Sequence, residues 1–325
     1  MAARGGAQPG GGFSNGQVLL LATAIVLPGL APSYFGWLTG LLAIPVFSLL
    51  GMHGPGRGSI LIRNALLLAA IPILLLKLIG TLLFALTLIP LGYSFNRSAT
   101  AGDSEWKTVF KGCLYLGACW VLLWSAYGTM EGVHPYRHLL ELIDSGFAQS
   151  YEYYRAQSDV PAESLFYFEQ AITQTRRLVP FLLPGLLCCI VVLTVWVNLM
   201  GGISLLSRLK PGYLPWKKFS RWRLPDWLIW PAISAGVLLL IADGEGAVTM
   251  ALTLLLVCGL FYFFQGLAVF IHLLDRWKVP PALRLVFYGM LIVQSYGLLL
   301  IALLGLADVW IDFRRRVNIN TQLGS

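Results

Sequence analysis

Two glutamines interrupt the longest apolar stretches of the chain, and their amide groups are the first candidates for chemistry. Gln265 lies within the run 250–274, and Gln294 lies within the run 285–310. An amide that faces lipid lacks hydrogen-bond partners, which costs free energy. Each glutamine is therefore expected to face protein or a water-filled cavity.

The two amides are expected at similar depths if the two runs form consecutive membrane spans. A rise of 1.5 Å per residue from the turn between the runs brings their depths within about 5 Å of each other. They either hydrogen-bond to each other as a helix-pairing contact or line a cavity that binds a polar ligand. The candidate ligand-binding residues, with the tyrosines as walls, are Gln265, Gln294, Tyr262, Tyr296 and Asn198.

Charged side chains recur at helical spacing where the last apolar run ends. Asp308, Asp312 and Arg316 stand at positions i, i+4 and i+8, so Asp312 and Arg316 are expected to attract each other on one helix face. This pattern suits a charged helix end at the membrane interface, or a docking site for lipid or a partner protein. The candidate contact residues are Asp308, Trp310, Asp312, Arg315, Lys217 and Arg221.

His134, His138 and Glu141 have a spacing that would suit a metal site on one helix face. However, Pro135 favours the first helical position, which makes His134 a capping residue outside the regular turn. We therefore expect a solvated helix start and no metal. The sequence also lacks HExxH, P-loop and GxSxG motifs. We expect no cofactor and no enzymatic activity.

The composition is that of a multi-pass membrane protein. Of 325 residues, 57% are hydrophobic and only 12% are charged, and the mean hydropathy is +0.74. The sequence predicts an all-α polytopic membrane bundle of eight or nine spans, with a short amphipathic helical cap on the non-cytoplasmic side. The net charge of +8 comes from basic loops between apolar runs, which favours contact with the lipid bilayer over nucleic acid.

The chain is expected to divide into a flexible tail, two groups of membrane helices around a polar segment, and a second tail. The predicted boundaries are 1–16, 17–130, 131–178, 179–312 and 313–325. The apolar run 60–91 is too long for one span and carries Lys77 near its middle. Two short helices that meet near Lys77 explain it best, and an intramembrane lysine that binds an anion or carries a proton is the alternative.

Basic residues favour a cytoplasmic N-terminus. The stretch 208–223 has the strongest concentration of positive charge and should also be cytoplasmic. Nine crossings would leave the three arginines 314–316 outside, whereas eight would bring them inside. The sequence leaves both counts open.

Three short motifs resemble those of the YybS-like family of predicted bacterial multi-pass membrane proteins, a domain of unknown function. They are FFQGLAVF at 263–270, GLADVWIDFRRR at 305–316, and HGPGRG at 53–58 after a proline-broken pair of apolar runs. The chain is more remotely similar to the substrate-binding subunits of energy-coupling-factor transporters. It departs from them in having more spans and in lacking their Ala-xxx-Ala contact in the first helix.

The resemblance implies a bacterial inner-membrane location and favours small-solute binding or transport of the substrate-binding-subunit type. The alternative is a non-catalytic scaffold in cell-envelope biogenesis or division. Such a scaffold would contact other membrane proteins through the acidic cap and the basic loop. An enclosed polar cavity at the depth of Gln265 would favour solute binding, whereas a dry bundle with an exposed apolar patch on the cap would favour the scaffold.

Overall fold

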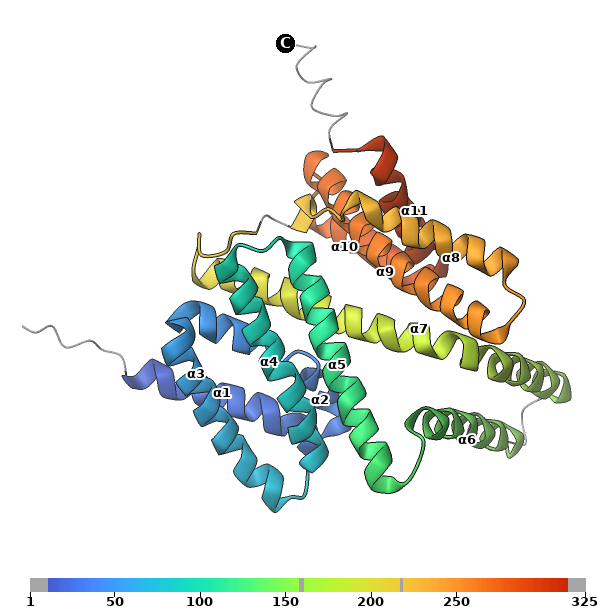
Figure 1. The fold of residues 1–325 in the computed structure, drawn as a ribbon, viewed down its shortest axis with the longest axis horizontal. Coiled ribbons are helices and arrows are strands. Elements are labelled where there is room, and N and C mark those ends of the chain that lie inside the picture. The colour runs from blue at the N-terminus through green and yellow to red at the C-terminus, as the bar shows by residue number, and fades with distance from the viewer. Residues whose placement is uncertain (1–10, 158–160, 217–218, 315–325) are drawn as a thin grey trace, which may run out of the picture. The chain divides into compact units, whose positions relative to one another are not determined.

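The computed structural model describes residues 11–157, 161–216 and 219–314, which form eleven α-helices and two short 3-10 helices (Figure 1). The all-α class is therefore confirmed. The chain folds into two compact units. Unit 1 comprises residues 1–119 and 191–216, and unit 2 comprises residues 120–190 and 217–325. These boundaries cut through two long helices, so they differ from the contiguous domains expected from the sequence.

Unit 1 is built from the N-terminal helices and one end of each long helix. Its elements are α1 (Gly11–Leu30), α2 (Pro32–Thr39), α3 (Ala43–Leu75), α4 (Ile79–Ala101), the start of α5 (Glu105–Glu131) and the end of α7 (Ala162–Leu209). Helix α1 starts at Gly11, within the segment expected to be a tail. The core includes Phe47 and Phe95, which are fully buried and meet edge to face with ring centroids 6.0 Å apart.

Two irregular points break up the apolar runs of unit 1. The HGPGRG motif forms a kink inside α3, because Gly54 adopts φ 78° and Pro55 begins the second part of the helix. The predicted break near Lys77 is confirmed: α3 ends at Leu75, α4 begins at Ile79, and Lys77 between them is exposed at φ 56°.

Four hydrogen bonds gather several helix ends at one end of unit 1. They join Gln17 to His53 at 2.8 Å, Lys210 to the Gly51 carbonyl at 3.0 Å, Tyr213 to Asn96 at 3.2 Å, and Trp216 to the Asp103 carbonyl at 2.8 Å. The start of α1, the kink of α3, the end of α4 and the first part of the basic stretch therefore lie together. The break at Lys77 lies at the other end of α4.

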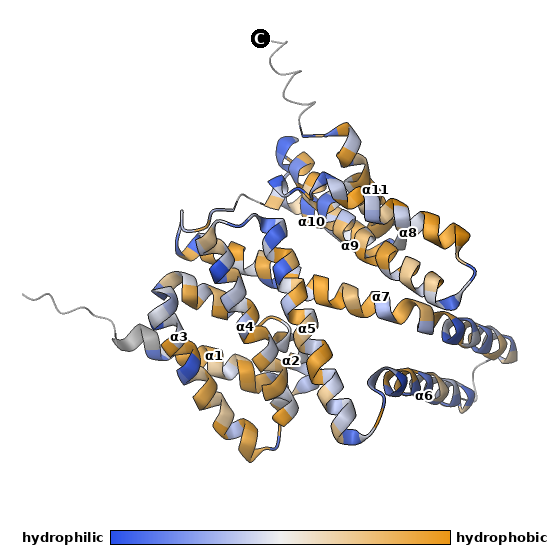
Figure 2. Cartoon of the chain, in the orientation of Figure 1, coloured by the Kyte–Doolittle hydropathy of each residue, from blue (hydrophilic) through white to orange (hydrophobic). Residues whose placement is uncertain are grey.

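Unit 2 contains a polar helical pair and a group of apolar helices. Its elements are the end of α5, α6 (Pro135–Arg155), the start of α7, η1 (Phe219–Arg221), η2 (Asp226–Leu228), α8 (Ile229–Ile241), α9 (Glu245–Arg276), α10 (Pro281–Val293) and α11 (Ser295–Ile311). Figure 2 shows that α6 and the start of α7 are the most hydrophilic helices of this unit.

The predicted amphipathic segment is helical, and its second helix continues into the next apolar run as α7 without a break. His134 caps α6 as expected: its Nδ1 accepts a hydrogen bond from the Arg137 backbone N–H at 3.4 Å, and Pro135 follows at the first helical position. Arg176 of α7 pairs with Asp144 of α6 at 2.8 Å.

Five helices of the described residues are long and apolar enough to span a membrane. They are α3, α4, α5, α7 and α9. A sixth candidate is the pair α10 and α11, whose axes bend by 105° at their junction. Residues 15–30 and 226–241 form shorter apolar helices. The expected eight or nine spans exceed the five long helices because several apolar runs are divided by kinks and turns.

Replacement of Lys77 by glycine should stabilise the fold. A side chain at φ 56° costs roughly 1–2 kcal/mol relative to glycine, so Lys77→Gly should raise the unfolding temperature of the detergent-purified protein. Lys77→Ala removes the same charge but keeps a Cβ, and it should leave the unfolding temperature nearly unchanged. Equal losses of stability in both variants would instead assign Lys77 an electrostatic role.

Candidate functional site

Helices α9 and α11 cross in backbone contact at two glycines. A Cβ on Gly266 would collide with the carbonyl of Ile301, and a Cβ on Gly305 would collide with the carbonyl of Tyr262. Small residues allow this close approach between membrane helices. Near this crossing, Gln265 of α9 and Asp308 of α11 come within hydrogen-bonding distance of each other.

Gln265 links three segments of unit 2. Its side chain is only 1% exposed, and its Nε2 donates to Asp308 Oδ2 at 3.1 Å. Its Oε1 accepts the backbone N–H of Leu224 at 3.3 Å, from the segment that precedes α8. The expectation that this amide faces protein is confirmed, but its partner is Asp308 and not Gln294.

Arg314 completes the buried cluster. Asp308 is 1% exposed, its Oδ2 lies 3.4 Å from Arg314 Nη2, and its Oδ1 accepts the Phe313 backbone N–H at 3.2 Å. Arg314 Nη1 also donates to the Trp222 carbonyl at 2.9 Å. Burial lowers the pKa of Arg314, and the Asp308 carboxylate opposes this shift. We call Gln265, Asp308, Arg314 and the backbone of Trp222 and Leu224 the polar clamp.

The helix face expected to carry Asp308, Asp312 and Arg316 does not extend beyond Ile311. Helix α11 ends at Ile311, and Asp312 adopts the left-handed conformation with φ 44°, so the chain leaves the helix axis. Asp312 instead faces Arg223, whose Nη1 lies 3.4 Å from Asp312 Oδ2. Because the chain turns back, Arg314 reaches Asp308. Arg316 lies outside the described residues.

The remaining candidate residues are distributed over the molecule. Gln294 and Tyr296 lie at the junction of α10 and α11, where Gln294 is exposed and Tyr296 is 78% exposed. Tyr262 is buried at the α9–α11 crossing. Trp310 and Arg221 are exposed, and Lys217 and Arg315 lie outside the described residues. The grouping of Gln265, Tyr262, Gln294 and Tyr296 around one ligand stays a prediction.

Asn198 belongs to unit 1 and is fully buried. Its Nδ2 donates to the Gly40 carbonyl at 2.6 Å and to the Thr194 carbonyl at 2.8 Å. Its Oδ1 has no hydrogen-bond partner in the described part of the chain. An unpaired buried amide oxygen is costly, so this position is unusual.

The roles of Arg314, Trp222 and Leu224 were missed by sequence reasoning. A turn after α11 brings Arg314 into the polar clamp, and two interactions of the clamp use backbone groups of the segment before α8. The concentration of charge at 208–223 and 314–316 was visible in the sequence, but the contact between Arg314 and Trp222 was not.

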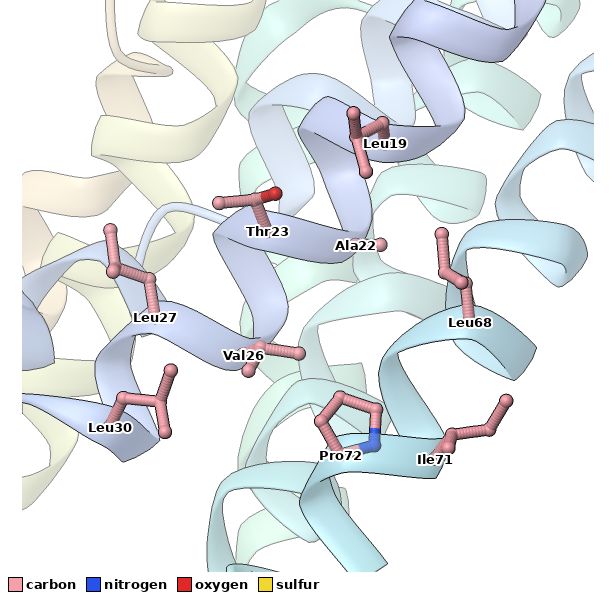
Figure 3. Close-up of a pocket in the computed structure, with 9 residues that line it drawn as sticks. All are labelled: Leu19, Ala22, Thr23, Val26, Leu27, Leu30, Leu68, Ile71 and Pro72. Carbon is pink, nitrogen blue, oxygen red and sulfur yellow. The ribbon is translucent and has the colours of Figure 1, made fainter.

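Three hollows are notable in the described residues. An apolar groove of about 390 Å³ lies between α1 and α3 (Figure 3). A hollow of about 470 Å³, which we call the α2 hollow, is lined by Pro28, Pro32, Gly36, Trp37, Thr39, Gly40, Gly80, Thr81 and Phe84. A small hollow of about 160 Å³ lies between α6 and α7. None of the three is lined by Gln265, Asp308 or Arg314.

The side chains of the polar clamp bind one another and hold two chain segments against α9. In the residues that the structure describes, no three histidine, cysteine or acidic side chains form a group that could hold a metal. The close glycine crossing and the pairing of the clamp residues with one another together indicate that the polar clamp holds α11 against α9.

The chain belongs to a family described as predicted membrane proteins of unknown function (DUF2232), whose model matches residues 18–309. The match covers most of the chain, including the helices of both units. No curated protein and no solved structure matches the chain. Family membership therefore agrees with the membrane class deduced from composition and leaves the activity open.

Replacement of Asp308 by asparagine should destabilise the protein strongly. It removes the carboxylate that pairs with the largely buried Arg314 guanidinium, and breaking a buried ion pair typically costs about 3–5 kcal/mol. The matched control is Asp226→Asn, because Asp226 also pairs with an arginine but its side chain is 75% exposed. Thermal unfolding in detergent measures both. Equal unfolding temperatures for the two variants would contradict the fastening role.

Replacement of Gly266 by alanine tests the glycine crossing. The new Cβ would push α11 away from α9, and the expected loss of stability is about 1–3 kcal/mol or more. Gly259 lies on the same helix, and a Cβ added there would meet no atom within 4 Å, so Gly259→Ala should be neutral or slightly stabilising. If the two variants unfold at the same temperature, the helices do not cross at Gly266.

Proposed function

We propose that this chain is a non-catalytic membrane protein that binds a small solute, of transport type, and that the α2 hollow is its binding site. The observation that carries the proposal is this hollow, together with the buried Asn198 that donates to the carbonyl of its lining residue Gly40. Both features belong to unit 1.

The size and lining of the α2 hollow suit a small polar molecule. Ligand sites usually measure roughly 300–1,000 Å³ and combine apolar walls with a few polar groups. Trp37 and Phe84 supply apolar walls, whereas Thr39 and Thr81 carry hydroxyl groups. Three glycines, Gly36, Gly40 and Gly80, leave backbone groups accessible along the lining.

Asn198 supports the proposal from the interior side of Gly40. Its Nδ2 fixes the Gly40 carbonyl, so the amide helps to set the backbone at the edge of the hollow. Asn198 is itself fully buried and does not line the hollow, and an ordered water beside its Oδ1 would satisfy the missing hydrogen bond. Of the five ligand-binding candidates derived from the sequence, Asn198 is therefore the one that the proposal retains most directly.

The α2 hollow lies at the end of unit 1 that is remote from the basic stretch. It contacts the end of α1 and the start of α4, whereas the end of α4 meets Trp216. If the basic stretch is cytoplasmic, the hollow faces the non-cytoplasmic side. The protein would then capture its solute outside a bacterial inner membrane, with its own N-terminus in the cytoplasm.

This orientation corresponds to six crossings before the basic stretch. They run through α1, through α2 with the first part of α3, through the rest of α3, and through α4, α5 and α7. The polar pair of α6 and the start of α7 then forms the non-cytoplasmic cap.

The scaffold function is the second candidate, and exposed aromatic side chains on the cap favour it. Tyr153, Phe166 and Tyr167 are 66%, 63% and 60% exposed. Exposed aromatic groups on a polar segment can bind a partner protein. If no solute stabilises the purified protein, the scaffold function is favoured.

A thermal-shift screen of the parent and of a variant with a filled α2 hollow tests solute binding. The parent should be stabilised by one class among vitamins, nucleobases and amino acids, by roughly 2.7 kcal/mol at 100 times the dissociation constant. Gly36→Leu should abolish this shift, because a side chain there extends into open space in the hollow. Gly259→Leu, also in open space but in unit 2, should retain the shift.

Two results would contradict the proposal. One is a solute that stabilises the parent and Gly36→Leu equally, which would locate binding elsewhere. The other is a screen with no stabilising solute in any class.

A further inference from the structure

The two helices that follow α9 are joined by a sharp bend. Helix α10 has 13 residues and α11 has 17. Length alone does not decide how they cross the membrane, because α8 also has only 13 residues. The two helices are joined at Gln294 with a bend of 105°, so they form either one broken span or a hairpin that re-enters the membrane.

The start of α10 is held at the end of α9. Arg284 of α10 forms an ion pair with Asp275 of α9, and its Nε donates to the Val279 carbonyl at 2.8 Å. The positive φ of Lys278 belongs to the tight turn between the two helices. The first residues of α10 therefore lie at the same membrane face as the last residues of α9.

The end of α11 is held at the segment that precedes α8. Arg314 donates to the Trp222 carbonyl at 2.9 Å, and Asp312 pairs with Arg223 at 3.4 Å. The charges of Arg221, Arg276 and Arg314 all act on His272. The end of α11 therefore lies beside the segment before α8, which meets α9 at Gln265.

Helices α8 and α9 explain why these ends share one face. They pack against each other and are joined by a short acidic turn at 242–244, so α8 leaves the face of the basic stretch and α9 returns to it. Helix α10 starts from that face, and α11 ends at it. A single broken span would have to end at the opposite face.

The tip of the pair carries polar groups that do not suit lipid. Gln294 is exposed, and the neighbouring Val293 and Tyr296 are 83% and 78% exposed. Irregular backbone at membrane depth is tolerated where it is buried in protein or lines a water-filled cavity. An exposed glutamine amide needs hydrogen-bond partners, so water suits Gln294 better than lipid does.

We propose that α10 and α11 form a re-entrant hairpin that enters and leaves the bilayer on the side of the basic stretch and presents Gln294 to water inside the membrane. Gln294 and Tyr296, both exposed at this break, are the polar residues of the hairpin tip.

Thiol labelling of the full-length protein in sealed membrane vesicles tests the hairpin. The five native cysteines are replaced by alanine, and single cysteines are introduced as Arg221→Cys, Asp243→Cys, Trp310→Cys, Gln294→Cys and Leu299→Cys. An impermeant maleimide should label Arg221→Cys and Trp310→Cys from one side. It should label Asp243→Cys only from the other.

A small charged thiosulfonate reports on the tip. Gln294→Cys should react within about tenfold of the rate of Arg221→Cys, whereas Leu299→Cys, an exposed apolar position on α11, should be protected by lipid. Labelling of Trp310→Cys from the Asp243→Cys side would overturn the proposal by showing a complete span. Protection of Gln294→Cys equal to that of Leu299→Cys would overturn it by showing a dry tip. No solute is used, so these outcomes are independent of binding at the α2 hollow.

Discussion

The hydrogen bond between Gln265 and Asp308 is the interaction on which the C-terminal half of the fold depends. It joins α9 and α11 where two glycines bring their backbones into contact, and its partners hold the segment before α8 and the turn after α11. In a membrane, such polar groups have no alternative partner in lipid. Satisfying them inside the protein holds α11 against α9 at this crossing.

The lack of hydrogen-bond partners in lipid also distinguishes the paired polar side chains of this protein from the unpaired ones. Gln265 and Asp308 are buried and paired with each other, so they stabilise structure. Asn198 is buried with its oxygen unpaired, and Gln294 is exposed at a helix break. These two amides lie in different units, and our two proposals assign a solute or water to each of these regions. Solute capture at the α2 hollow and a wet hairpin tip are therefore separable properties.

Much of the fold could be predicted from the sequence because hydropathy and helix signals are local. The membrane class, the break at Lys77, the cap at His134 and the burial of Gln265 follow from neighbouring residues. The pairing of Gln265 could not be predicted, because it depends on a glycine crossing and on the left-handed turn at Asp312 that redirects Arg314. Equal depth suggested Gln294 as the partner, but depth does not determine which helix faces meet.

Native mass spectrometry of the protein released gently from its own membranes tests the central claim most directly, because it detects a co-purified solute of any identity by its mass alone. The account predicts a small-molecule adduct of defined mass on the parent and on Gly259→Leu, and its loss from Gly36→Leu, whose side chain would fill the α2 hollow. Identical spectra for the three proteins, with bare protein or lipid adducts only, would contradict solute binding at this site.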